Sequence, residues 1–163
     1  MPTIIGKAWE LVVQGSGARR ALVIGGSMSG LLAALALARR GFDVHVFERV
    51  ESELAGRGAG IVAQPQLRDV FRAIGLPDVE LGVSVTLRRS YAIDGRLAGE
   101  IVCPQTLTSW DRVYRLLRDA FPPARYHRGK ALEEVVVRPG SVIARFADGA
   151  RVEGDVLIGA DGL

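Results

Sequence analysis

The sequence is short of several residue types, and each shortage excludes a class of function. Cysteine occurs once, at Cys103, so the chain can form neither an internal disulfide nor a cysteine-based zinc cluster. Lysine occurs only at Lys7 and Lys130, and the 21 basic residues are spread along the chain among 18 acidic ones. This even spread argues against a nucleic-acid partner. No segment has the roughly 18 consecutive apolar residues of a membrane span, so we expect no membrane partner.

The first 17 residues differ from the rest and end in the glycine- and serine-containing stretch QGSG. They lack a basic start followed by an apolar core, because Lys7 and Glu10 interrupt the apolar stretches. We therefore interpret residues 1–17 as a leader or linker, not a signal peptide, and residues 18–163 as one domain. With a single cysteine and no export signal, the expected location is cytoplasmic.

The composition itself supports a folded domain, with 48% apolar residues and a mean hydropathy of +0.21. Residues 21–26 form a short apolar run that ends in glycines, which is typical of a buried strand. Residues 29–41 contain strong helix formers and end at a glycine, and residues 43–49 alternate as a second strand. This β-helix-β order predicts a right-handed parallel crossover.

The remainder predicts a mixed middle and a strand-rich end. We expect a glycine-bearing loop over residues 50–65, a helix over 66–74 and a hairpin turn at Asp94-Gly95. A further helix over 109–121 has Ser109 as its N-cap. Short strands separated by glycine turns follow, and the last of this meander covers residues 156–158. The predicted fold is α/β and Rossmann-like, with a parallel sheet and an antiparallel β-meander.

The sequence GGSMSG, at residues 25–30, joins the first strand to the first helix. In the dinucleotide fingerprint GxGxxG, the first glycine makes a tight turn, the second admits a pyrophosphate and the third allows close helix packing. Gly25 and Gly30 fill the first and third positions, whereas Ser27 replaces the second glycine. A serine is small and its hydroxyl can donate to phosphate, although a glycine turn of this kind can also be purely structural.

Glu48 ends the second strand about 20 residues after the glycine turn, where dinucleotide-binding domains carry the carboxylate that accepts ribose hydroxyls. A second anion beside Glu48 would be repelled, which argues against a 2′-phosphate. These residues leave two cofactors open, FAD and NAD.

Three segments together resemble the single-component FAD-dependent aromatic hydroxylases, the group A flavoprotein monooxygenases with the para-hydroxybenzoate hydroxylase fold. They are ALVIGGSMSGLLAALALARRGFDVHVFER, GRGAGIVAQPQL and EGDVLIGADG. The serine in the glycine motif, RGAGIVAQP and TSWDRVYRLL are most similar to members that act on hydroxypyridines. The resemblance spans residues 21–162 and implies FAD as cofactor, NAD(P)H as electron donor, and hydroxylation of a small aromatic or hydroxypyridine substrate with O₂.

The resemblance also implies roles for individual residues. The pyrophosphate turn would comprise Gly25, Ser27, Met28, Ser29 and Gly30, with Glu48 at the adenosine ribose and Arg49 on the adenosine side. Gly58, Ala59 and Gly60 would lie on the loop that passes the flavin, where glycine allows close backbone approach. Asp161 and Gly162 match a further cofactor motif of the family. Trp110 departs from the pattern, because many relatives carry Arg or Gln there, and on an apolar helical stripe it is expected in the core.

We predict no catalytic residue and no metal ligand, since the flavin carries the chemistry in this family. His45 and His127 are interpreted as structural, and Cys103 as a small apolar residue. The family's substrate domain and second Gly-Asp motif are not present in the sequence. We therefore expect a FAD-binding portion, truncated before the substrate domain and inactive alone. A homodimer stays open, as do two alternatives: a NAD-binding dehydrogenase-type domain and an inactive FAD-binding remnant.

Overall fold

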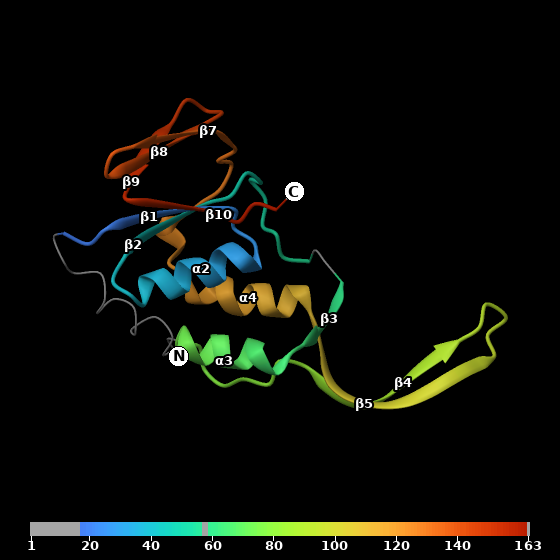
Figure 1. The fold of residues 1–163 in the computed structure, drawn as a ribbon. Helices are drawn as coiled ribbons and strands as arrows, with labels where there is room; N and C mark the ends of the chain where they lie inside the picture. Colours follow the sequence, from blue (N-terminus) through green and yellow to red (C-terminus); the bar gives the residue numbers. More distant parts are fainter. Residues whose placement is uncertain (1–16, 57–58, 163) are drawn as a thin grey trace. The chain divides into compact units, whose positions relative to one another are not determined.

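The computed structural model describes residues 17–56 and 59–162. Most of the predicted leader and Gly58, a predicted flavin-loop residue, lie outside this described part. The chain divides into two compact units, one of Met1–Gly56 with Tyr114–Leu163 and the other of Arg57–Val113. Figure 1 shows the elements of each unit.

A four-stranded parallel sheet forms the centre of the first unit, with strand order β10-β1-β2-β6. Its strands are β1 (Arg20–Ile24), β2 (Asp43–Phe47), β6 (Tyr126–His127) and β10 (Val156–Gly159). Leu22 and Val23 of β1 are completely buried. Burial on both faces explains why β1 is a continuous apolar run and not an alternating one.

The two faces of this sheet are covered by different structures (Figure 1). Helix α2 (Met28–Ala38) connects β1 to β2 and packs against both strands. On the opposite face lies an antiparallel sheet of β7 (Leu132–Arg138), β8 (Ser141–Phe146) and β9 (Arg151–Gly154). Ile24 and Phe47 pack there against Ala144 and Phe146 of β8. The predicted βαβ opening and the antiparallel meander are thus confirmed.

The last strand corrects the prediction. Residues 156–158 were expected to end the antiparallel meander, but β10 instead pairs in parallel with β1, from Ala21 opposite Val156 to Ile24 opposite Gly159. Asp155 fixes this register, because its carboxylate accepts the Arg20 N–H at 2.6 Å and its own N–H donates to the Arg20 carbonyl at 2.8 Å. Leu157 of β10 packs there against the buried cluster that includes Leu22 and Ile24.

The second unit contains β3 (Gly60–Ala63), α3 (Pro65–Ala73), β4 (Val83–Tyr91) and β5 (Leu97–Ser109), with sheet order β3-β5-β4. The hairpin between β4 and β5 turns at Asp94-Gly95 as predicted, and Gly95 has a φ of +83°. β3 falls within the segment that we expected to be only a loop. That prediction was wrong because four residues beside glycines carry too little pattern to indicate a strand.

Helix α4 (Trp110–Ala120) begins in the second unit and continues into the first. The prediction of Ser109 as its N-cap is confirmed, since the Ser109 Oγ accepts the Arg112 N–H at 3.1 Å. A short 3₁₀ turn, η2 (Pro123–Arg125), then leads into β6. Within the described ranges, no helix combines the length and apolar character needed to cross a bilayer.

Candidate functional site

The turn between β1 and α2 requires glycine at position 25 for two separate reasons. Gly25 has a φ of +100°, a conformation that L side chains rarely adopt. A Cβ at this position would also lie 2.5 Å from the Ala160 carbonyl carbon and 2.6 Å from the Asp161 nitrogen. The backbone after β10 therefore lies directly against the glycine turn.

The other glycines of the turn permit equally close approaches. A Cβ on Gly30 would lie 1.8 Å from the Gly25 carbonyl oxygen, which matches the close packing expected of the third fingerprint glycine. A Cβ on Gly26 would lie 2.1 Å from the Tyr126 hydroxyl oxygen. The fingerprint treats position 26 as free, so the sequence analysis did not select Gly26. The pair of adjacent glycines was the feature of the sequence that could have indicated a close contact at position 26.

The N-terminus of α2 has the character of an anion site. Ser27 is the N-cap residue, but its side chain makes no capping hydrogen bond, and the first turn contains no acidic residue. Met28 and Ser29 therefore open the helix with uncapped backbone N–H groups and the positive end of its dipole. Ser29 also donates from its Oγ to the Ala160 carbonyl at 3.4 Å. Such helix ends are common binding sites for phosphate groups.

Glu48 lies beside this turn as a buried carboxylate, with only 6% of the residue exposed. Its Oε2 accepts the Gly26 N–H at 2.8 Å, and its Oε1 accepts the Val50 N–H at 2.9 Å. It forms no ion pair with any residue that the structure describes. A carboxylate oxygen accepts two hydrogen bonds, so each oxygen retains acceptor capacity for a ligand hydroxyl.

The predicted motif at Asp161 and Gly162 follows the backbone that lies against the glycine turn. The Ala160 N–H donates to the Ile24 carbonyl at 2.7 Å, which extends the pairing of β10 with β1 to the start of the glycine turn. Asp161 is exposed, and Gly162 has a φ of +74°. Three predicted segments that lie far apart in the sequence thus meet at the carboxyl ends of the parallel strands β1, β2 and β10.

The remaining predicted residues have other surroundings. Arg49 is exposed and forms no ion pair within the described part of the chain. Ala59 and Gly60 are exposed residues of the second unit, where the Ala59 carbonyl accepts the Trp110 N–H at 3.1 Å and Gly60 pairs with Ser109. Trp110 itself is only partly buried. Its backbone thus links the proposed flavin loop to the start of α4.

Tyr126 is a site neighbour that the sequence analysis missed. Its hydroxyl donates to the Gly26 carbonyl at 2.9 Å, and the guanidinium of Arg118 lies 4.3 Å from the centre of its ring. Burial, together with the nearby charge of Glu48, outweighs a hydrogen bond with Tyr114 and raises the pKa of Tyr126. Tyr126 lies 100 residues after Gly26, and no local pattern in the sequence indicates this contact.

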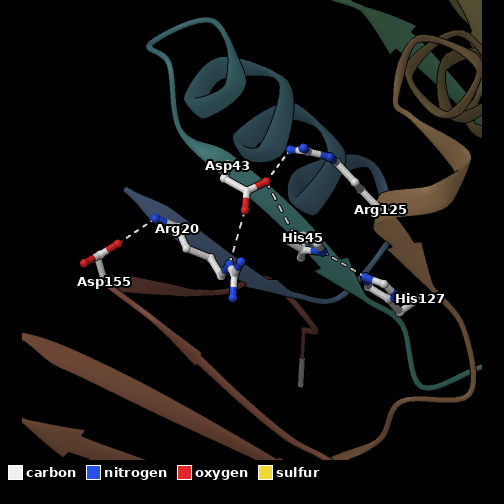
Figure 2. Close-up of polar contacts among 6 residues, drawn as sticks. All are labelled: Arg20, Asp43, His45, Arg125, His127 and Asp155. Atoms are coloured by element: carbon white, nitrogen blue, oxygen red, sulfur yellow. Dashed lines mark hydrogen bonds and ion pairs between the residues drawn. The ribbon is translucent and has the colours of Figure 1, made fainter. Parts of the chain in front are cut away.

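Both histidines belong to a polar cluster on β2 and β6 (Figure 2). His45 Nδ1 lies 3.0 Å from His127 Nε2, and His45 Nε2 lies 3.5 Å from an Asp43 carboxylate oxygen. Asp43 also forms ion pairs with Arg20 and Arg125. Burial would raise the pKa of Asp43, but the Arg20 hydrogen bond and the Arg125 and His45 charges outweigh it and lower that pKa. The described residues contain no group of His, Cys, Asp and Glu side chains arranged to hold a metal ion.

Comparison with known proteins places the glycine turn in a known domain. A family model described as the NAD(P)-binding Rossmann-like domain matches residues 23–74, which include the turn, α2, β2 and Glu48. The match covers the segment in which strand, glycine turn, helix and acidic residue follow one another.

Two curated monooxygenases are similar in sequence to the chain. It is 39% identical over 144 residues to 2,6-dihydroxypyridine 3-monooxygenase of Paenarthrobacter nicotinovorans, a match covering 88% of the chain and 36% of that protein. It is 32% identical over 157 residues to 6-hydroxynicotinate 3-monooxygenase of Pseudomonas fluorescens, covering 88% of the chain and 40% of that protein. The chain thus spans about two fifths of the length of these curated relatives.

Solved structures agree with the sequence comparison. The fold matches 2,6-dihydroxypyridine-3-hydroxylase from Arthrobacter nicotinovorans with a TM-score of 0.80 and 37% identity, over 91% of this chain and 38% of that chain. It matches HpxO of Klebsiella pneumoniae, solved with FAD and uric acid, with a TM-score of 0.74 and 26% identity, over 93% of this chain and 41% of that one. The resemblance to FAD-dependent aromatic hydroxylases and the Rossmann-like fold are both confirmed.

Proposed function

We propose that the chain binds FAD and is the FAD-binding portion of a monooxygenase that uses NAD(P)H and O₂ to hydroxylate a small aromatic substrate of the hydroxypyridine class. One observation carries the proposal: the buried Glu48 carboxylate is joined by a 2.8 Å hydrogen bond to the glycine turn that opens α2. That juxtaposition offers a ribose acceptor and a pyrophosphate site side by side. The similarity to hydroxypyridine monooxygenases supports the substrate class.

The residues present fit the adenosine diphosphate half of FAD. The α2 N-terminus supplies uncapped N–H groups for an anion, and the glycines at positions 25, 26 and 30 let the turn pack closely against Ala160, Tyr126 and its own backbone. No described cation pairs with Glu48, so a free ribose hydroxyl is favoured there over a 2′-phosphate. The residues proposed to hold the cofactor are Gly25, Ser27, Met28, Ser29, Gly30, Glu48, Arg49, Gly58, Ala59, Gly60, Asp161 and Gly162.

When bound, the flavin supplies hydride acceptance from NAD(P)H and the activation of O₂. The chain's own residues bind and orient the cofactor. Glu48 accepts hydrogen bonds from the ribose, and the first turn of α2 neutralises part of the pyrophosphate charge. We assign no proton transfer to any side chain and propose a cytoplasmic location, consistent with a single cysteine.

The first test compares flavin retention by the wild-type chain and by Glu48→Gln. The substitution keeps the shape of the side chain but removes the charge and one acceptor, so we expect FAD binding to weaken roughly tenfold or more, a loss of about 1.4 kcal/mol. The measurements are visible flavin absorbance after gel filtration and titration calorimetry with FAD. Glu153→Gln, an exposed glutamate of β9, serves as the matched control and should bind as the wild type does. Equal binding by Glu48→Gln would remove Glu48 from the site.

A second candidate function, a NAD-binding dehydrogenase-type domain, is favoured by the name of the matching domain family. The same purified chain distinguishes the two. We expect a yellow protein that takes up FAD and shows no comparable affinity for NAD. A colourless chain that binds NAD and leaves FAD unbound would overturn the proposal in favour of the dehydrogenase-type domain.

A further inference from the structure

We propose that Tyr126 is a positioning residue of the cofactor site: it fixes the Gly26 peptide and thereby aligns the pyrophosphate turn with the Glu48 carboxylate. This inference rests on the proposed FAD site. Tyr126 would not touch the reacting part of the cofactor. It would act through the backbone of the glycine turn.

Gly26 is hydrogen-bonded through both its carbonyl and its N–H group. The Tyr126 hydroxyl donates to the Gly26 carbonyl at 2.9 Å, and the Gly26 N–H donates to Glu48 Oε2 at 2.8 Å. All three residues are buried. The orientation of Gly26 is thus fixed between a phenol and a carboxylate, and a rotation of its backbone would break one or both bonds.

The short strand β6 supplies a contact to Gly26 and a contact to Glu48. Tyr126 pairs with Val46 of β2, and the next residue, His127, accepts the Glu48 N–H through its carbonyl at 2.8 Å. The Tyr126 side chain therefore sets Gly26, while the backbone of His127 sets Glu48. β6 has only two residues, so it adds little to the stability of the sheet. It does place the contacts to Gly26 and Glu48 on adjacent residues.

Packing keeps the Tyr126 ring in place. Arg118 lies over the ring at 4.3 Å from its centre, with Arg128 at 5.8 Å, and such cation-ring contacts are attractive. A Cβ on Gly26 would lie 2.5 Å from the ring carbon Cζ as well as 2.1 Å from the hydroxyl. The ring thus occupies the space that any side chain at position 26 would need. This contact accounts for the second glycine of the GG pair, which the dinucleotide fingerprint leaves unexplained.

The variant Tyr126→Phe isolates the hydroxyl. It retains the ring and its packing, removes the donor, and leaves the buried Gly26 carbonyl without that partner. The Gly26–Ser27 peptide is then freer to rotate, which loosens the geometry of the hydrogen bond between the Gly26 N–H and Glu48 Oε2. The expected defect lies in the adenosine diphosphate half of the cofactor site.

The experiment measures calorimetric binding of FAD and of ADP to the wild type, to Tyr126→Phe and to Tyr91→Phe, with the unfolding midpoint of each apoprotein as a check on folding. Tyr91 is an exposed tyrosine of β4, so its variant is the matched control. We expect Tyr126→Phe to weaken FAD and ADP by the same factor, about tenfold or about 1.4 kcal/mol. Tyr91→Phe should bind both ligands as the wild type does.

A double-mutant cycle separates positioning from a general loss of structure. If Tyr126 acts through Gly26 and Glu48, then Tyr126→Phe should cost less than threefold in FAD affinity in a Glu48→Ala background. A full tenfold loss in that background would contradict the inference, as would FAD binding by Tyr126→Phe within twofold of the wild type. A wild-type chain that binds neither FAD nor ADP would instead contradict the proposed function itself.

Discussion

At the residue scale, Gly25 joins two segments that lie far apart in the sequence. Its φ of +100° permits the turn, and its missing side chain admits the backbone of Ala160 and Asp161. The positive φ and the close approach are separate requirements for glycine, and a second glycine of the chain allows their energetic costs to be compared. Gly149 has a φ of +83°, but a Cβ there would meet no atom within 4 Å.

We therefore expect Gly25→Ala to destabilise the chain more than Gly149→Ala does. The backbone conformation alone costs about 1–3 kcal/mol for a non-glycine residue, and this is the whole cost expected at position 149. Gly25→Ala should cost that amount plus the steric overlap with Ala160, and should also weaken FAD binding. Chemical denaturation of both variants gives the free energies of unfolding. Equal losses in the free energy of unfolding at the two positions would show that the close approach of Ala160 to Gly25 does not contribute to the cost of Gly25→Ala.

The site was only partly predictable at this scale. Gly25, Gly30 and Glu48 follow from a spacing rule that encodes one local unit of structure, and the structure places them together. Gly26 and Tyr126 are paired by tertiary folding alone, because 100 residues separate them. A pattern within one segment contains no information about which distant residue will fill the space above a glycine.

At the element scale, the pairing of β2 with β6 brings the two histidines of the chain, His45 and His127, into contact. Burial lowers the pKa of His45 below its ordinary value of 6.5, and the Arg125 and Arg20 charges add to this effect against the opposing influence of Asp43. Burial, the neighbouring His45 and the Lys130 charge lower the pKa of His127. The folded state thus favours the neutral form of both rings more strongly than the unfolded chain does.

This arrangement predicts how stability depends on pH. Above pH 6.5 the folded and the unfolded chain both carry neutral histidines, and the contribution of the histidine pair to the free energy of unfolding is fully present. As the pH falls below 6.5, the unfolded chain takes up protons that the folded chain resists, so the free energy of unfolding decreases until the pH passes the lowered folded-state pKa values. Urea denaturation between roughly pH 7 and 5 should show this decrease. The double variant His45→Gln/His127→Gln should show a flatter profile, and an unchanged slope would exclude the histidine pair as its cause.

The elements themselves were predictable where the pattern is long and local. The β1-α2-β2 unit, the Asp94-Gly95 hairpin and the α4 N-cap all follow from periodicity, turn residues and capping chemistry. β3 and β6 have only four and two residues, too few to establish a period. β10 was recognised as a strand but assigned to the wrong sheet, because its partner β1 precedes it by 135 residues.

At the scale of the whole molecule, burial is distributed very unevenly along the chain. Three residues of β1 are completely buried, whereas residues 86–102 of β4, β5 and their turn are all exposed. Exposed apolar side chains on this outer hairpin include Tyr91, Leu97 and Val102. A two-stranded ribbon without a covered face has little stability of its own.

Hydrogen exchange should therefore separate these regions. Amides of β1 and β2 are expected to exchange only through global unfolding, and those of the outer hairpin through local opening, faster by a factor on the order of 10³ or more. Exchange followed by mass spectrometry at several protein concentrations provides the measurement. Slow exchange of residues 88–100 that matches β1 would contradict this expectation and indicate that another surface covers the hairpin.

The position of β10 beside β1 also affects how the chain is made. A ribosome releases β1, α2 and β2 early, but β1 lacks one of its two neighbouring strands until residues 156–159 have emerged. Closing a loop of that length slows the formation of such contacts. The apolar run of β1 therefore stays incompletely paired while the residues between β1 and β10 are being synthesised, a period in which an unpaired strand is exposed to aggregation and to chaperones. The glycine turn that follows β1 acquires its contacts with Ala160 and Asp161 only after those residues have been synthesised.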